Sequence, residues 1–550
     1  MYLGKTSLLQ ILAGRSKPLG QVYINGYKYS SDMRRKISFI LQEDLFLESS
    51  SYTVRDHLSF FSALKSCSKM KASERVSVIN SLTSRLGINH LLDIPIDFLS
   101  GGEQKRVSIC AGLLGEGKIL LIDEGTSGLD SGASHAFVKT LRQLADEMRV
   151  AILLSIHAPN TNVYNLFDKL LILCEGKTVY NGYCLNFMQF LSSAGFHEQS
   201  ISYSPLDFVL DILYVDDAKR SQLMNQWNDE ELLIQLNCII EGSNNKGKRQ
   251  LIEYPANYGT QLVHLFIRSL KSSSTNSFSF LNITQTVAVA LVIGSCWLQL
   301  QANTESNITP VTYYLFFINA YFLFWGMFGG LLEFIPELKI ITLDRQAGLY
   351  RLSAYFLSKT ISCLPAKIVH PLIFSLVSYP MVIVPFQVKT YFLVSCCLVL
   401  TTLMGDSLGL FIGTFTHKTN QAISLCVIIS IAILLLGGFF IKQLSSYLEW
   451  AKYVSFLRYS YLATIKLQFQ SYPKIYCDHE GSAIALCRNK PYIPGDIIVQ
   501  YFGSDERYPG AVTTNDGIII DISICLAFFL FFRFASYILL RFNHFKMRRE

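Results

Sequence analysis

The pattern of hydrophobic and polar positions divides this chain into two parts near residue 258. Before that point, short apolar runs alternate with amphipathic stretches and polar loops, a pattern typical of buried strands connected by helices. After it, apolar segments approach the length of about 20 residues that a helix needs to cross a bilayer. The sequence therefore predicts an α/β domain followed by an all-α transmembrane domain.

Six apolar segments make up the second part, and each is close to the length of a membrane-crossing helix. They are residues 281–300, 311–332, 366–385, 391–415, 421–441 and 517–540. An even number of crossings returns the chain to the side on which it began. The alternative, a bundle of buried helices in a soluble protein, would need a core too large for one domain.

Domain limits follow from the same pattern. The α/β domain is predicted over residues 1–230, a polar linker over 231–260 and the transmembrane domain over 261–550. The linker contains Ser-Asn-Asn-Lys-Gly-Lys at 243–248, a composition typical of disorder. One long loop outside the membrane is expected over residues 442–516.

Positive charge gathers on one side of the predicted crossings, which indicates that this side faces the cytoplasm. The basic residues on that side are Arg268, Lys271, Lys339, Arg345, Arg351, Lys359, His417, Lys418, Lys546, Arg548 and Arg549. No cleavable secretory signal follows Met1, so both termini are expected in the cytoplasm. The sequence thus predicts a multi-pass membrane protein, and we expect it in the plasma membrane.

Composition agrees with this assignment. Half of the residues are hydrophobic and 16% are charged, whereas a soluble protein is about one quarter charged. The net charge of +7 is modest for 550 residues. It requires no nucleic-acid partner, because basic residues beside membrane helices account for it. The thirteen cysteines follow no repeated metal-binding spacing.

Leu-Ser-Gly-Gly-Glu-Gln-Lys-Arg at 99–106 is the most informative motif of the first part. Ser100, Gly101 and Gly102 indicate a helix start, where free backbone N–H groups and the helix dipole favour an anion such as phosphate. Glu103 follows them in the expected first turn.

A second motif comes shortly afterwards. Four apolar residues at 119–122, which predict a buried strand, are followed by Asp123 and Glu124. A strand that ends in two carboxylates is typical of phosphoryl-transfer sites, which hold Mg²⁺ and orient a water molecule. A merely solvated acidic pair is disfavoured directly after four apolar residues.

In the order in which they occur, these two motifs resemble the signature and Walker B motifs of ABC-transporter ATPases. Gly4, Lys5, Thr6 and Ser7 then resemble the end of a Walker A phosphate-binding loop. The first glycine of that loop would precede residue 1, so a domain incomplete at its N-terminus is expected.

The resemblance implies a role for each polar residue at the site. Lys5 would reach the β- and γ-phosphates of ATP, while Thr6, Gln42 and Asp123 would bind Mg²⁺. Glu124 would act as the general base that polarises the attacking water.

Two more residues follow predicted strands, at the positions of the Q-loop and the switch histidine. Gln42 would also contact the attacking water, and His157 would contact the γ-phosphate. Both are therefore predicted to act in catalysis beside Glu124.

The signature residues Ser100 to Glu103, and Asp130 in the segment that resembles the D-loop, would bind ATP across the interface with a second chain. In this family nucleotide lies between two ATPase domains. Since the chain has one set of motifs, a homodimer or heterodimer with a second half-transporter is implied. The family usually has proline after the Walker B glutamate, and this chain has Gly125.

An ATPase domain that precedes the membrane domain resembles the G subfamily, the white-type half-transporters. Segments of the second part support this resemblance, namely 334–337, 348–356, 364–365, 437–441 and 450–459. It implies ATP-driven export or flipping of a lipophilic substrate, such as a lipid, sterol, pigment precursor or xenobiotic. The motion would be transmitted through the cytoplasmic elbow near Glu337 to Arg351.

The outer loops carry two further candidate sites. Cys477 and Cys487 lie in the long outer loop, and because family members carry cystines there, they are predicted to form a disulfide. Asn307, in Asn-Ile-Thr, is a candidate glycosylation site in the first outer loop. Asp406, Asp521 and Arg533 fall within predicted crossings, where charges are costly and indicate a functional role. The alternative is a position near the membrane interface, with the Arg533 side chain reaching toward the polar layer.

Two alternatives stay open at this stage. The chain could be a catalytically impaired or regulatory partner subunit, or an incomplete gene product, since most of the phosphate-binding loop is missing. A soluble ATPase that shares the signature is excluded by the six apolar segments.

Overall fold

A computed structural model shows that the chain forms two compact units. It describes residues 4–18, 20–25, 27–29, 36–42, 46, 51–66, 70–115, 117–127, 130–157, 159–196, 205–215, 217–226, 254–416, 418–437, 439–440, 447, 449–477, 487, 491–495, 497–498 and 515–547. Unit 1 comprises residues 1–272, 341–358 and 545–550, and unit 2 comprises 273–340 and 359–544. The segment 341–358, which comes from the second part of the sequence, therefore belongs to the same unit as the predicted α/β domain.

A parallel sheet positions the candidate site in unit 1. Its strands are β3 (Ile37–Ile40), β4 (Ile119–Ile122) and β5 (Ala151–Leu154), in the order β3-β4-β5. Ile122 pairs with Ile40 on one side and with Leu154 on the other, so the three strands end at the same level. The residues that follow each strand consequently meet along one edge of the sheet.

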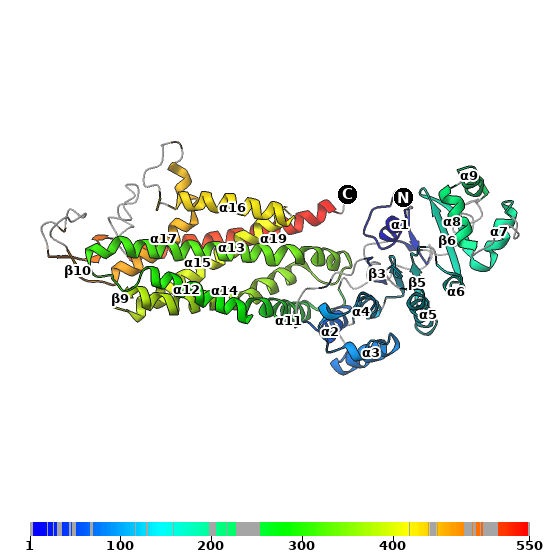
Figure 1. Cartoon of the computed structure of the whole chain (residues 1–550), viewed down its shortest axis with the longest axis horizontal. Coiled ribbons are helices and arrows are strands. Elements are labelled where there is room, and N and C mark those ends of the chain that lie inside the picture. Colours follow the sequence, from blue (N-terminus) through cyan, green and yellow to red (C-terminus); the bar gives the residue numbers. More distant parts are fainter. Residues whose placement is uncertain are drawn as a thin grey trace. The chain divides into compact units, whose positions relative to one another are not determined.

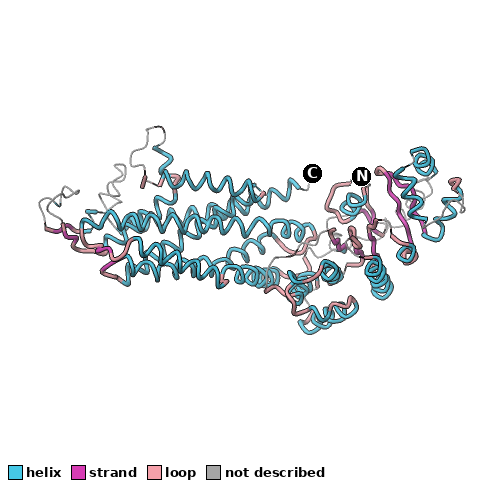
Figure 2. Tube along the Cα trace, viewed as in Figure 1, coloured by secondary structure: helices cyan, strands magenta, loops and turns pink. Residues whose placement is uncertain are grey.

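Figures 1 and 2 show the helices of unit 1 together with its strands. They are α1 (Lys5–Leu12), α2 (Val54–Lys65), α3 (Ala72–Arg85), α4 (Gly101–Leu113), α5 (Ser131–Met148), α6 (Thr161–Tyr164), α7 (Phe187–Ser193), α8 (Pro205–Val215), α9 (Asp217–Gln226) and α11 (Tyr258–Ser277), with 3₁₀ turns Asn89–Leu91, Ile96–Phe98 and Cys184–Asn186. Leu58 of α2, Ile109 of α4 and Leu120 of β4 are fully buried in one cluster. Their burial holds α4 against the sheet.

Two antiparallel pairs complete the strands of unit 1. They are β1 (Tyr23–Ile24) with β2 (Tyr27–Lys28), and β6 (Lys169–Cys174) with β7 (Lys177–Tyr183). The second pair shares a core with α7, α8 and α9, in which Val179, Phe187 and Leu191 are fully buried. This core is separate from the cluster beneath α4.

Unit 2 is a bundle of long helices that run side by side (Figure 1). The helices are α12 (Phe280–Cys296), α13 (Ile308–Gln346), α14 (Leu352–Val382), α15 (Val388–Thr416), α16 (Thr419–Leu436), α17 (Phe456–Gln470) and α19 (Asn515–Met547). Short elements of this unit are β8 (Leu300–Gln301) with β9 (Ile383–Val384), β10 (Ile475–Tyr476) with β11 (Tyr492–Ile493), and the turns Glu305–Asn307 and Glu449–Tyr453.

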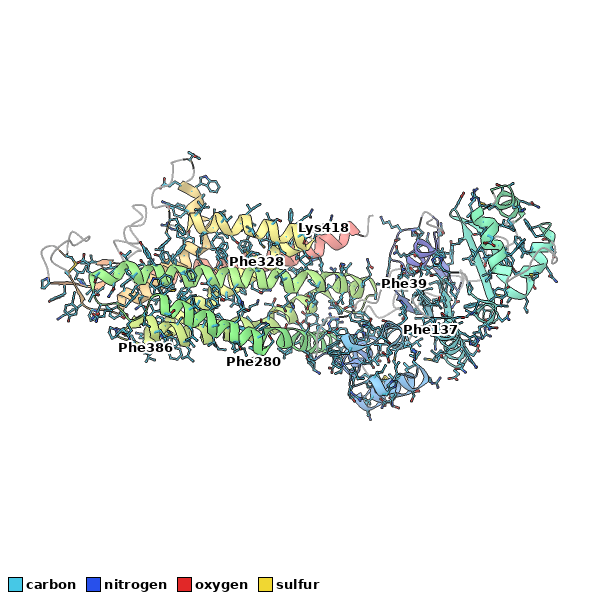
Figure 3. All side chains as sticks on the ribbon, in the orientation of Figure 1. Phe39, Phe137, Phe280, Phe328, Phe386 and Lys418 are labelled. Atoms are coloured by element: carbon cyan, nitrogen blue, oxygen red, sulfur yellow. A yellow bond between two sulfur atoms is a disulfide. The ribbon has the colours of Figure 1, made fainter. Side chains whose placement is uncertain are left out.

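Five described helices are long and apolar enough to cross a membrane. They are Glu305–Gln346, Leu352–Val382, Val388–Thr416, Thr419–Leu436 and Gly517–Phe542. Phe280–Cys296 is a shorter apolar helix, and its first residue, labelled in Figure 3, is 87% exposed. In a bilayer such exposed apolar side chains contact lipid.

Helices α13 and α14 extend well beyond the apolar runs that the sequence predicts, 311–332 and 366–385. An apolar run marks only the hydrocarbon layer, whereas the helix continues where polar side chains find partners. Lys359 pairs with Glu333 at 2.7 Å and Glu337 at 3.1 Å, which joins the extended ends of the two helices. Pro336 and Pro365 lie inside helices, a placement that packing against neighbouring helices permits.

Glycines bring the main chains of α13 and α15 into direct contact. A Cβ added to Gly326 would lie 2.3 Å from the carbonyl oxygen of Thr402, and one added to Gly405 would lie 2.1 Å from that of Leu323. At Gly409 the distance to the Met327 carbonyl oxygen would be 2.0 Å. Only glycine permits helices to approach this closely.

Charges inside the bundle are paired. Asp406, which is 3% exposed, accepts from Lys367 at 3.2 Å and from Arg533. Asp521 pairs with Lys466 at 2.6 Å. The charges that the sequence places within the crossings therefore hold helices together, because an unpaired charge at these buried positions would be very costly.

Candidate functional site

The start of α1 offers backbone donors to an anion. Gly4, which precedes the helix, has φ of +86°, a left-handed conformation that glycine adopts without strain. Lys5 opens the helix, and Thr6 and Ser7 are exposed beside it. The unpaired N–H groups of the first helical turn and the hydroxyl of Thr6 are the groups that bind phosphate and its cation.

The three strand ends bring the remaining polar residues to one place. The Nε2 atom of Gln42, after β3, donates to Oε2 of Glu124, after β4, at 2.8 Å. The Nε2 atom of His157, after β5, lies 3.0 Å from Oε1 of the same carboxylate. Lys5 Nζ lies 3.3 Å from His157 Nε2 and donates to the Ile156 carbonyl at 3.2 Å. Four residues far apart in sequence thus form one connected group.

Ser155 is a member of this group that the sequence analysis did not single out. Its hydroxyl donates to Asp123 Oδ1 at 2.7 Å and accepts from the Glu124 backbone N–H at 2.8 Å. Since Ile122 pairs with Leu154, the register places Ser155 directly beside Asp123. A hydroxyl one residue past the third strand was the available sequence signal.

The electrostatics of Lys5 reflect two opposing effects. Partial burial lowers its pKa, while the carboxylates of Glu124 and Asp123 raise it. An anionic phosphate bound at this position would stabilise the charged ammonium further.

Glu124 and Gly125 form a tight turn after β4. Glu124 has φ of +48°, an unusual conformation for a residue with a side chain. A Cβ added to Gly125 would lie 2.8 Å from Leu154 Cδ1 and 2.9 Å from Ile122 Cγ2. Glycine in place of the family's proline therefore fits the close packing of this turn against the sheet.

Replacing Gly125 with alanine is expected to destabilise this turn by about 1–3 kcal/mol, because the buried side chain of Ile122 and the half-buried side chain of Leu154 must move. The rate of ATP hydrolysis should also decrease, since this turn determines the orientation of the Glu124 side chain. Thermal unfolding of the purified protein and its rate of ATP hydrolysis measure the two effects. Gly176→Ala is the control. A Cβ added to Gly176 would meet nothing within 4 Å, but Gly176 has φ of +78°, so the loss of stability in this variant measures backbone strain without a steric clash.

The signature residues form a separate capped helix start. The Oγ atom of Ser100 donates to Glu103 Oε2 at 2.7 Å, and the Ser100 N–H donates to the same oxygen at 2.9 Å. These two bonds lower the pKa of Glu103 and fix Ser100, Gly101 and Gly102 at the beginning of α4. In the described part of the chain these residues do not contact Lys5, Glu124 or His157.

Asp130 also caps a helix. Its Oδ1 atom accepts from the Ala133 N–H at 2.6 Å at the start of α5. The segment that resembles a D-loop comprises Ser127 to Asp130, and its middle residues Gly128 and Leu129 lie outside the described residues.

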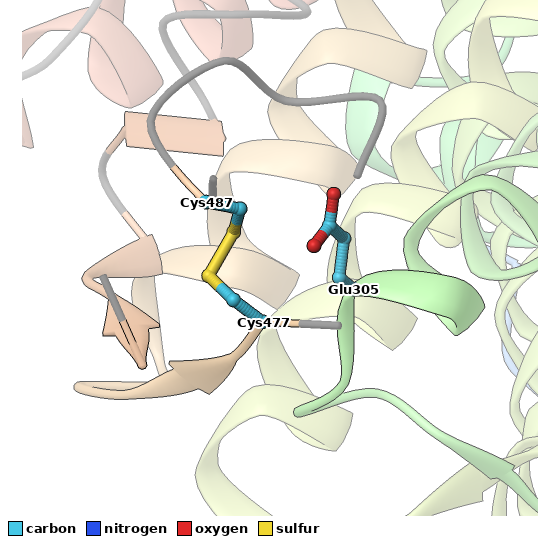
Figure 4. A group of neighbouring side chains, drawn as sticks. All are labelled: Glu305, Cys477 and Cys487. Carbon is cyan, nitrogen blue, oxygen red and sulfur yellow. A yellow bond between two sulfur atoms is a disulfide. The ribbon is translucent and has the colours of Figure 1, made fainter. Parts of the chain in front are cut away.

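The cysteine pair and the asparagine that the sequence analysis singled out belong to unit 2. Figure 4 shows Cys477 and Cys487 joined by a disulfide, with Cα atoms 5.3 Å apart, beside the carboxylate of Glu305. Although a glutamate and two cysteines are a possible metal-binding set, the sulfur atoms are bonded to each other and are not thiolate ligands. The amide nitrogen of Asn307 donates to Gln301 O and Thr304 Oγ1.

Comparison with known proteins identifies both parts of the chain. Residues 3–127 match the ABC transporter family model, and residues 260–469 match the ABC-2 type transporter model. The chain is 28% identical over 502 residues to ABC transporter G family member 21 of Arabidopsis thaliana, an alignment that covers 85% of this chain and 74% of that protein.

Two animal proteins are equally similar. Protein white of Drosophila melanogaster is 28% identical over 83% of this chain and 70% of its own length. The broad substrate specificity ATP-binding cassette transporter ABCG2 of Mus musculus is 28% identical over 84% of this chain and 76% of its own length. The order of an ATPase domain followed by a helical membrane domain, expected from the sequence, is confirmed.

Proposed function

Because this chain belongs to the ABC transporters of the G family, we propose that it exports or flips a lipophilic substrate as one half of a dimeric, ATP-hydrolysing transporter. The observation that carries the proposal is the connected group of Lys5, Gln42, Glu124 and His157. In this group Lys5 is the cation that binds phosphate, and Gln42 and His157 orient the carboxylate of Glu124.

Each member of the group has a distinct part in hydrolysis. Lys5 neutralises charge on the transferred phosphoryl group. Glu124 accepts a proton from the attacking water, and Gln42 and His157 hold its two carboxylate oxygens from opposite sides. This fixation keeps the base in one orientation and so lowers the entropic cost of reaching the transition state.

The residues present also fit Mg²⁺. The carboxylate of Asp123, the amide oxygen of Gln42 and the hydroxyl of Thr6 are the hard oxygen ligands that this ion prefers. Ser155 orients Asp123 through its hydroxyl. The ion, when bound, supplies positive charge to the phosphate oxygens, and these side chains would hold it.

Contacts within unit 1 support a route from the ATPase core to the membrane helices. Lys271 of α11 pairs with Asp56 of α2 at 2.7 Å. Arg268, one turn earlier on α11, lies over the ring of Phe60 of α2 and pairs with Asp344 at 2.9 Å. We propose that α2 moves when ATP binds, and that α11 and the 341–358 segment carry this motion onward.

The exposed aromatic residues of α13 support a lipophilic substrate. Tyr313 and Phe317 are 47% and 44% exposed, whereas Tyr314 and Phe322 of the same helix are buried in the core of unit 2. An apolar face of this kind suits either lipid or a flat, lipophilic molecule.

Reconstitution of the full chain tests the proposal. Purified protein in lipid vesicles should hydrolyse ATP in a vanadate-sensitive manner and should move fluorescent lipids or sterols across the bilayer only when ATP is present. Lys5→Met is the inactive control. Hydrolysis without movement of any of these probes would contradict the proposed substrate class, and the absence of hydrolysis would contradict the mechanism.

Pairs of variants test the dimer. Lys5→Met and Ser100→Arg should each abolish hydrolysis when every chain carries the change. In a mixed dimer, one ATP site then contains both changes and the other contains neither, so coexpression of the two tagged variants should restore hydrolysis. Restoration fails if each chain completes its own ATP site.

A further inference from the structure

Lys105 lies in the second turn of α4, with only 7% of its surface exposed. Its Nζ atom donates to the backbone carbonyl of Leu41 and, at 3.2 Å, to that of Gln42. A buried ammonium is costly unless it is hydrogen-bonded, so these contacts hold the side chain strongly.

The two carbonyls lie where β3 leaves the sheet. The last ladder contact is the bond from the Asp123 N–H to the Ile40 carbonyl, at 3.0 Å. Strand β3 ends at Ile40, and the next two carbonyls along the chain are those that Lys105 binds. Lys105 therefore fixes the backbone of Gln42 at the point where the sheet no longer does.

The position of the Gln42 backbone decides where its amide points, and this amide donates to Glu124 Oε2 at 2.8 Å. Lys105 sits five residues after Ser100 on the same helix, which the Ser100–Glu103 pair caps. We propose that Lys105 is a positioning residue for hydrolysis, which aligns Gln42 with Glu124. Because Lys105 belongs to α4, this alignment depends on the position of α4.

This inference rests on the proposed function and adds a mechanical link to it. When Ser100 engages ATP bound by the second chain, α4 becomes fixed. Through Lys105 the backbone at Gln42 becomes fixed with it, so each chain prepares its own Glu124 once its signature is engaged.

Lys65 provides a matched comparison. It is also a lysine whose Nζ donates to two successive carbonyls, those of Ala111 at 2.7 Å and Gly112 at 3.2 Å. These carbonyls lie at the opposite end of α4, away from Gln42. Loss of either lysine removes hydrogen bonds from an ammonium group to two backbone carbonyls. Of the two lysines, only Lys105 contacts the end of β3 beside the site.

Kinetics of the full-length protein test the proposal. Lys105→Met should lower kcat for ATP hydrolysis about tenfold or more and change KM for ATP less than about twofold, because alignment of the base is lost and nucleotide binding is kept. Lys105→Arg, which retains a cation with several donors, should recover hydrolysis toward the parent value. Lys65→Met should lower the melting temperature while kcat stays within about twofold of the parent.

Hydrogen–deuterium exchange of the same proteins gives a readout that does not require activity. Lys105→Met should speed exchange in peptides covering 37–42 and 119–127, whereas Lys65→Met should do so only near the end of α4. Lys105→Gln serves in these comparisons if the methionine variant does not fold.

Equal losses of kcat for Lys105→Met and Lys65→Met, or unchanged exchange at 119–127 in the Lys105 variant, would overturn the inference. A parent protein without vanadate-sensitive hydrolysis would instead count against the proposed function. The exchange measurement then still decides the role of Lys105.

Discussion

Replacing Glu124 with glutamine is expected to lower the rate of ATP hydrolysis by about 10²–10³-fold while ATP binding is kept. The amide is nearly the same size as the carboxylate and can still bond to Gln42 or His157, but it cannot accept a proton from water. ATP-bound dimers should therefore accumulate. Phosphate release from the purified transporter and retention of labelled ATP on it measure the two effects.

Glu147→Gln is the matched control for this experiment. Glu147 lies on α5 and forms an exposed ion pair with Arg85, so its loss should leave hydrolysis unchanged. If Glu124→Gln hydrolyses ATP at more than about one tenth of the parent rate, Glu124 is not the general base, since such a base contributes at least about 10²-fold.

Replacing Gly409 with alanine is expected to destabilise the membrane domain by about 3 kcal/mol. The added methyl group would lie 2.0 Å from the Met327 carbonyl oxygen, and a backbone atom cannot rotate away as a side chain can. Helices α13 and α15 must then separate, and the neighbouring contact at Gly405 would be lost with them. Thermal unfolding in detergent and the yield of folded protein report the change.

Gly259→Ala is the matched control, because a Cβ at this position of α11 meets nothing within 4 Å. Alanine favours a helix over glycine, so this variant should be at least as stable as the parent. Equal melting temperatures for Gly409→Ala and the parent would show that α13 and α15 tolerate a wider spacing than the structure has.

The site could be predicted from the sequence where local patterns determine it. Asp123, Gln42 and His157 each follow a short apolar run, and parallel strands bring such positions to one edge of a sheet. Ser155 and Lys105 could not be found in this way. A serine after a strand and a lysine in a helix have many possible partners, and only the tertiary structure determines which carbonyl or carboxylate is near.

In the membrane part, too, local patterns predict some features and only the tertiary structure determines the others. Hydropathy indicates which segments are apolar, but it does not show that α13 continues to Gln346. In this extension Glu333 pairs with Lys359 and Asp344 pairs with Arg268, and such partners are not visible in the hydropathy pattern. Asp406 and Arg533 could be recognised as charges within crossings. Lys367, which completes their group, lies near the start of a predicted crossing and gives no signal of its own.

The group of Asp406, Lys367 and Arg533 has a consequence for building hybrids from related transporters. Its members come from α15, α14 and α19, and removal of one member leaves another charge buried without its partner. These three helices therefore have to be exchanged together. A chimaera that takes α15 alone from a relative without this carboxylate would assemble poorly, even if every contact at its surface were kept.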